Sequence, residues 1–220
     1  MDRSSNRKSL AAPILFAFLA AAIGPFSEAQ QAKKAPVDPD PAVRRPASSL
    51  GLKASMTWKV EGDGDDVTAK TLGELMPSKK VTLLFFLSAR DPATLANAER
   101  IAKLSDEALK KSVNVVGLSV GQGETLQELD DLHDQYDWNF PIVRDPDLSI
   151  VRGLKASYTP QAMLIDPAGR VRYSGPVDDC WFDARKAKES FLKKALDALL
   201  AGKKVSNPEP ATSYPGGQIR

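Results

Sequence analysis

The chain has 220 residues, of which 42% are hydrophobic and 26% are charged, and its formal net charge is +2. This length is typical of one domain, or of one domain with appendages. The nearly balanced charge gives no electrostatic basis for binding nucleic acid or an anionic membrane surface, so we expect neither as a partner. The sequence contains neither a zinc-ligand cluster nor a phosphate-binding loop, and we expect no metal and no cofactor.

The first 29 residues have the pattern of a secretory signal peptide. Arg3, Arg7 and Lys8 form a basic start, Leu10–Ile23 is almost wholly apolar, and small residues flank a possible cleavage point at Ser27–Ala29. The alternative is an uncleaved membrane anchor, but the apolar run is shorter than the roughly 20 residues that a spanning helix needs. We therefore expect export to a periplasmic or extracellular location, with no stable membrane span after cleavage.

Composition divides the rest of the chain into a linker, a domain and a tail. Residues 30–49 are rich in Ala and Pro and would bury too little apolar surface to offset their ordering entropy, which predicts a flexible linker. Residues 50–202 carry the strand and helix periodicities of a folded domain. Residues 203–220 are polar and rich in Pro and Gly, and we expect them to form a C-terminal tail.

Residues 81–94 combine a buried strand with the start of a helix. Val81–Leu87 is fully apolar and has the length of a strand covered on both faces. Asp91 lies where an N-cap belongs, Pro92 suits the first helical turn, and the helical period continues to about Lys111. A strand followed by a short loop and a helix N-terminus is the place where α/β folds carry their chemistry.

The other predicted elements continue the alternation of strands and helices. Residues 54–60 alternate apolar and polar side chains and predict an edge strand. The later predictions are a strand at Val113–Val120, helices at Glu124–Tyr136 and Leu148–Leu154, strands at Gln161–Asp166 and Arg170–Ser174, and a last helix at Lys186–Leu200.

The loop before the first helix resembles the redoxin branch of the thioredoxin-like proteins, which includes the alkyl hydroperoxide reductase and thiol-specific antioxidant group. In that family an apolar strand leads to Cys-Pro or Cys-x-x-Cys at a helix N-terminus, and the matching residues here are Asp91–Thr94. Tyr158–Pro160 matches the segment that carries the family's cis-proline, and Asp166–Gly175 matches its hairpin. The resemblance implies a thioredoxin-like α/β fold, with a mixed central β-sheet and helices on both faces. We expect Pro160 to be cis, the alternative being a trans proline at a strand start.

By this resemblance both thiols are missing. Asp91 stands where the first cysteine would be and Thr94 where the second would be, so the loop cannot attack or resolve a disulfide. A carboxylate at this position can still cap the helix, with a stabilisation of roughly 0.5–2 kcal/mol. Arg90 has two options, pairing with Asp91 or solvation, and we expect solvation. The residues expected to form a binding cleft are Arg90, Asp91, Pro92, Tyr158, Thr159 and Pro160.

The single cysteine, Cys180, lies between the hairpin and the last helix. Three roles are open to it: a buried inert residue, an intermolecular disulfide or a peroxidatic thiol, of which the first is expected. A metal site would require aspartates from several segments to meet in space, which the sequence does not indicate. These aspartates are Asp63, Asp65, Asp91, Asp178 and Asp179.

Two functions of different classes are compatible with these observations. The first is a non-catalytic binding or scaffold module that receives an extended peptide or protein partner between Asp91 and Pro160, because backbone pairing beside a cis-proline needs no cysteine. The second is a divergent thiol-dependent oxidoreductase or peroxidase that uses Cys180. A third hypothesis assigns a structural role to the linker or the tail. The sequence leaves open whether the protein is an enzyme.

Overall fold

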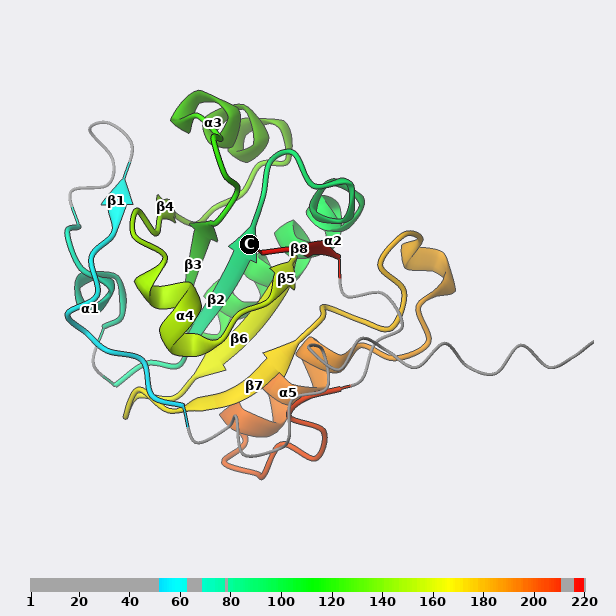
Figure 1. Ribbon diagram of the computed structural model, residues 1–220. Coiled ribbons are helices and arrows are strands. Elements are labelled where there is room, and N and C mark those ends of the chain that lie inside the picture. Colours follow the sequence, from blue (N-terminus) through cyan, green and yellow to red (C-terminus); the bar gives the residue numbers. More distant parts are fainter. Residues whose placement is uncertain (1–51, 63–68, 78, 211–215, 220) are drawn as a thin grey trace, which may run out of the picture. The chain divides into compact units, whose positions relative to one another are not determined.

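The strand predicted at Val81–Leu87 is β2 (Thr82–Leu87), and it lies inside a sheet in the computed structural model (Figure 1). The structure describes residues 52–62, 69–77, 79–210 and 216–219, which all belong to the unit formed by residues 38–220. Within these residues the main sheet has six strands in the order β1-β4-β3-β2-β6-β7. The other strands are β1 (Glu61–Gly62), β3 (Asn114–Ser119), β4 (Ile142–Arg144), β6 (Gln161–Ile165) and β7 (Val171–Gly175).

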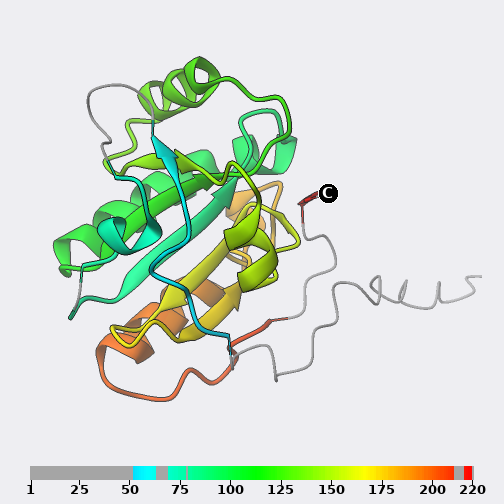
Figure 2. The same cartoon turned by 60° about the vertical axis from the view of Figure 1, so that its left-hand side comes forward.

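Helices cover both faces of this sheet (Figures 1 and 2). They are α1 (Leu72–Leu75), α2 (Pro92–Lys110), α3 (Leu126–Gln135), α4 (Ser149–Leu154) and α5 (Phe191–Leu200). Leu83, Phe85 and Leu87 of β2 pack in one apolar cluster with α2, α3 and α5. Leu84 and Phe86 pack in a second cluster with α1 and α4. The side chains of β2 alternate between the two clusters, which explains why the whole strand is apolar.

The pairing directions make the sheet mixed, as expected. β3 runs parallel to β2 and β4 runs parallel to β3, whereas β6 pairs antiparallel with the other side of β2 and with β7. Phe86 near the end of β2 lies opposite Gln161 at the start of β6. The residues just before Gln161 are therefore carried to the end of β2, where α2 begins.

The edge strand predicted at residues 54–60 is wrong. The carbonyls of Met56 and Trp58 accept the N–H groups of Gly73 and Leu72, at 3.0 and 2.8 Å, and so satisfy the first turn of α1. The strand in this region is β1, which is two residues long and follows Val60.

The last helix begins later than predicted. It starts at Phe191 rather than Lys186, and residues 184–186 form a separate 3₁₀ turn. The carboxylate of Asp179 accepts the N–H groups of Lys188 and Glu189, at 2.8 and 3.1 Å. These two groups are therefore engaged by a side chain and not by helical carbonyls.

The residues after Gly202 contact the domain. Val205 is buried in the cluster that contains α5, and the carbonyl of Pro208 accepts the N–H of Ser174 in β7 at 2.9 Å. Farther on, β8 (Gly217–Gln218) pairs antiparallel with β5 (Tyr158–Thr159) in a separate two-stranded sheet of the described residues. Figure 1 shows β8 in dark red beside β5.

Residues 1–49, expected to contain the signal peptide and the linker, lie outside the described residues. In the part of the chain that the structure describes, none of the helices combines the length and the apolar character needed to span a bilayer.

Candidate functional site

Asp91 is the N-cap of α2, as predicted from its position before Pro92. One carboxylate oxygen accepts the N–H of Ala93 at 3.2 Å, and the other accepts both the N–H and the hydroxyl of Thr94, each at 3.2 Å. The Asp91 side chain is buried and Thr94 has no exposed surface. The two residues at the family's thiol positions are therefore in direct contact, and their groups form the cap of the helix.

The segment before β6 contacts Asp91 from the opposite side. The Thr159 hydroxyl donates to Asp91 Oδ2 at 2.8 Å across 68 residues of sequence. The Thr159–Pro160 peptide bond is cis, which confirms the prediction. Tyr158 and Pro160 are buried beside it. The antiparallel pairing of β2 with β6 explains this meeting, because it brings the start of β6 to the start of α2.

A third segment, β8, completes the surroundings of Asp91. The N–H of Gly217 donates to Asp91 Oδ2 at 3.4 Å, and Gly217 lies opposite Thr159 in the β5–β8 pair. The N–H of Ile219 donates to the carbonyl of Ser157 at 3.0 Å. Ser88 and Val120 join these segments around a cavity of about 220 Å³. The sequence suggested a polar tail here and not a strand in contact with the site.

The Asp91 carboxylate accepts hydrogen bonds from several of the protein's own donors, most of them at Oδ2. Among the described residues, five donors point at its two oxygens: Ala93 N, Thr94 N, Thr94 Oγ1, Thr159 Oγ1 and Gly217 N. Four of these donors contact Oδ2, which is more than its two lone pairs can serve equally, whereas Oδ1 accepts only the N–H of Ala93. Asp91 in this arrangement joins three segments of the chain.

Glu124, which was not among the predicted site residues, is a buried carboxylate near Asp91. It accepts hydrogen bonds from the hydroxyl of Ser88, from the N–H of Arg90 at 3.2 Å and from the hydroxyl of Ser119 at 3.0 Å. A Cβ on Gly121 would lie 1.9 Å from the Glu124 carboxyl carbon, so glycine leaves the room that this side chain occupies. Glu124 thus connects the loop before Asp91 with the end of β3. Apart from Gly121, no residue pattern in the sequence indicates this role of Glu124.

Arg90 does not take the role expected of it. Solvation was expected, but its guanidinium forms two hydrogen bonds with the Glu128 carboxylate of α3, both at 2.8 Å. Glu128 also closes the capping box of α3 with Thr125. The hydrogen bond from Arg90 is the main reason that the pKa of Glu128 falls to about 2. Arg90 and Pro92 are exposed, and neither is among the residues that line the cavity at Asp91.

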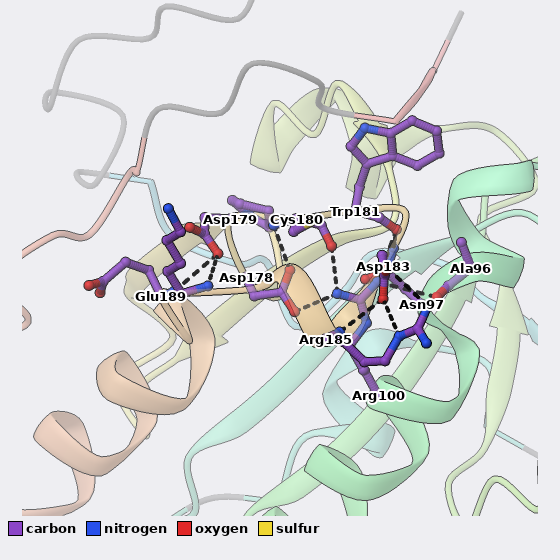
Figure 3. Close-up of polar contacts among 12 residues, drawn as sticks. Ala96, Asn97, Arg100, Asp178, Asp179, Cys180, Trp181, Asp183, Arg185 and Glu189 are labelled. Carbon is purple, nitrogen blue, oxygen red and sulfur yellow. Dashed lines mark hydrogen bonds and ion pairs between the residues drawn. The ribbon is translucent and has the colours of Figure 1, made fainter.

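Cys180 lies in a different environment, against the side of α2 (Figure 3). It is buried, as expected, and its carbonyl accepts a hydrogen bond from Arg100 at 2.6 Å. Arg100 and Asn97 each donate to the carbonyl of Trp181 at 2.9 Å. Cys180 is not among the residues that line the cavity at Asp91. Its chemical inertness stays a prediction.

The described aspartates do not converge on a metal site. Asp178 pairs with Arg100 and accepts the N–H of Cys180 at 2.9 Å, while Asp179 binds the backbone before α5 (Figure 3). Among the described residues, no group of three or more His, Cys, Asp or Glu side chains is arranged to hold a metal ion. Asp63 and Asp65 lie outside the described residues.

A model of the AhpC/TSA family matches residues 44–174, which is more than half of the chain. The chain belongs to the AhpC/TSA family. Its only cysteine is Cys180, so this member lacks the Cys-Pro and Cys-x-x-Cys motifs at the start of α2. No curated protein sequence matches the chain.

Solved structures share the fold of this AhpC/TSA family member. A hypothetical protein from Sinorhizobium meliloti 1021 aligns with a TM-score of 0.64 and 26% identity, over 76% of this chain and 93% of that one. A putative thiol:disulfide interchange protein DsbE from Chlorobium tepidum aligns with a TM-score of 0.54 and 17% identity, over 68% and 96%. An uncharacterized thioredoxin-like protein from Porphyromonas gingivalis aligns with a TM-score of 0.51 and 18% identity, over 68% and 94%. The fold is therefore thioredoxin-like.

Proposed function

We propose that this AhpC/TSA family protein is a non-catalytic binding module that holds an extended segment of a partner protein along β5, beside Pro160. The observation that carries the proposal is the set of hydrogen bonds that the Asp91 carboxylate accepts. Its carboxylate replaces the family's thiol and is occupied by donors from α2, β5 and β8. The helix N-terminus that would lower the pKa of a cysteine here is capped by a carboxylate, which has no thiol chemistry.

Thiol chemistry has no second location that the geometry favours. Disulfide exchange requires an accessible thiolate and a second thiol that resolves the mixed disulfide. Cys180 is buried, and its segment is fixed to α2 through Arg100 and Asn97. The family's usual reaction is therefore a poor description of this member.

Binding through the backbone requires no thiol. β5 is a short strand whose pairing partner in the structure is another extended segment, β8, and the Ser157 carbonyl just before β5 accepts the N–H of Ile219 just after β8. Addition of a strand to such an edge gains affinity from main-chain hydrogen bonds and specificity from the pockets along the edge. The arrangement supports an extended protein segment as the class of ligand.

We also propose that the protein acts outside the cytoplasm, on the basis of the signal-like residues 1–29. Mass spectrometry of the protein purified from a cell-envelope or medium fraction should find a new N-terminus near residue 30. An intact N-terminus on protein recovered from the cytoplasm would contradict export.

The non-catalytic assignment is tested by turnover assays on the mature protein and on its Cys180→Ser variant. Thiol-dependent peroxide reduction and insulin-disulfide reduction should both stay at the rate of the protein-free blank, because the helix N-terminus carries Asp91 in place of a thiol. A thioredoxin run in parallel shows that the assay detects turnover. Activity in the wild type that disappears in Cys180→Ser would make this a single-thiol enzyme and reject the proposal.

A further inference from the structure

The edge formed by β5 is already occupied by the chain's own β8, and the fit between the two strands constrains the ligand. We propose that this edge selects segments of the form Gly-Gly-polar-aliphatic, and that residues 216–219 are its resident ligand, which a partner's segment has to displace. The inference rests on the proposed binding function and specifies its ligand and its competitor.

The first position accepts only glycine. Gly216 has a φ of +104°, and a Cβ at this residue would lie 1.7 Å from the carbonyl oxygen of Thr159. The clash is with backbone that precedes Pro160 and cannot be relieved by turning a side chain. Any larger residue must therefore separate the bound segment from β5.

The second position, Gly217, contacts the side chains of Asp91 and Thr159. Gly217 donates its N–H to Asp91 Oδ2 at 3.4 Å, and its carbonyl oxygen lies 3.5 Å from the Thr159 hydroxyl oxygen, whose single proton is donated to Asp91 Oδ2 at 2.8 Å. A Cβ on Gly217 would lie 3.0 Å from Asp91 Cγ and 3.1 Å from Thr159 Oγ1, closer than these buried groups can easily allow. The carboxylate that replaces the thiol thus gains a role, since it accepts an N–H from the bound chain.

The third position, Gln218, suits a polar side chain, and the fourth position, Ile219, suits an apolar one. Gln218 pairs with Tyr158 and is exposed, so the edge places little demand on its side chain. Ile219 packs against the apolar cluster that contains α4, and its N–H bonds to the carbonyl of Ser157. A branched aliphatic side chain at this position is favoured because it removes apolar surface from water.

Occupation by the chain's own segment weakens the binding of any partner. A ligand joined to its site by the same chain acts at a high effective concentration, on the order of millimolar for short connections. The apparent association constant for an external segment equals the intrinsic constant multiplied by the fraction of molecules in which the edge is open. A tenfold excess of the closed form therefore weakens partner binding about tenfold.

The test measures binding of a synthetic peptide with the sequence of residues 213–220, labelled with fluorescein at its N-terminus, by fluorescence anisotropy. The full mature chain is compared with its Gly216→Ala variant, in which one added methyl group must displace the resident segment. Gly202→Ala is the matched control, because Gly202 also has a positive φ of +66° but nothing lies within 4 Å of its added Cβ. Thermal unfolding of the three proteins establishes that each is folded.

The expected result is that Gly216→Ala binds the peptide about tenfold more tightly, or better, than the wild type and Gly202→Ala do. A second peptide with alanine at its first glycine should not bind.

Equal affinity of the wild type and Gly216→Ala for the first peptide would show that residues 216–219 are no competitor. Equal binding of both peptides would overturn the selectivity while leaving β5 as a binding edge. Absence of binding to all three proteins would overturn the inference, whereas the non-catalytic assignment is decided separately by the turnover assays.

Discussion

Asp91 combines two roles that are usually carried by different residues. As the N-cap it satisfies N–H groups at the start of α2, and as a buried acceptor it joins this helix to Thr159 and Gly217. A cysteine at the same place could not accept this many hydrogen bonds with comparable strength. Replacing the thiol by a carboxylate therefore exchanges reactivity for a fixed junction between segments.

Asp91→Ala should lower the free energy of unfolding by about 1–3 kcal/mol, because it removes the cap and leaves buried donors without an acceptor. Thr125→Ala is the matched control, since Thr125 caps α3 through an exposed capping box. Its loss should be about 1 kcal/mol or less. Urea denaturation measures both variants. A loss for Asp91→Ala no larger than that for Thr125→Ala would contradict the role of Asp91 as a junction.

The Arg90–Glu128 pair predicts a defined response to pH. The carboxyl pKa of Glu128 is lowered from 4.5 to about 2, mainly by its hydrogen bond with Arg90. A lowered folded-state pKa means that the pair stabilises the fold above pH 4.5 and that this stabilisation is lost as the pH falls from 4.5 toward 2.

Arg90→Ala should move the pKa of Glu128 upward toward 4.5, as measured by NMR titration of the side-chain carboxyl carbon. Glu74 is the internal reference, because its pKa is lowered chiefly by the N–H of Lys70 and does not depend on Arg90. If the pKa of Glu128 stays near 2 in the variant, the hydrogen bonds from Thr125 are the real cause and the assignment to Arg90 is wrong.

At the scale of elements, α2 organises the segment that contains Cys180. Arg100 on this helix pairs with Asp178 and binds the carbonyls of Cys180 and Trp181 (Figure 3). The Arg100 side chain is 12% exposed and that of Asp178 is 8% exposed. Ions this deeply buried are costly to leave unpaired, so the pair strongly specifies how the segment lies on α2.

Arg100→Met should lower the free energy of unfolding by about 3–5 kcal/mol, because it leaves Asp178 as a buried charge without its partner. Lys111→Met is the control: Lys111 also extends from the end of α2 to a carboxylate, Asp197, but these side chains are 40% and 47% exposed. Its loss should stay below about 1 kcal/mol. Chemical denaturation compares the two, and similar small losses would contradict a structural role for the buried pair.

At the scale of the whole molecule, the site depends on how β2 is surrounded. Its antiparallel partner β6 delivers Thr159 and Pro160, and its parallel partner β3 delivers Ser119, which binds Glu124. The chain then returns to the same place through β8, after the last helix. The surroundings of Asp91 thus come from segments distributed over more than half of the sequence.

Much of the element order could be predicted from the sequence, because periodicity and capping are local properties. The apolar run of β2, Asp91 as N-cap and the strands of the hairpin were all visible in short windows of residues. The family resemblance predicts that Pro160 faces the loop at Asp91, and the neighbouring Thr159 donates a hydrogen bond to Asp91. In the same way, the absence of a thiol at the start of α2 follows from the residue identities alone.

The tertiary structure decided which partner each polar group takes. Arg90 pairs with Glu128 while staying exposed, the buried Glu124 accepts the N–H of Arg90, and Gly217 donates to Asp91 across 126 residues of sequence. None of these pairings has a local pattern, because a hydrogen bond between distant segments depends on the register of the sheet and on packing between them. The sequence by itself determined the scaffold and the loss of the thiols, and only the fold decided that residues 217–219 pair along the edge beside Asp91.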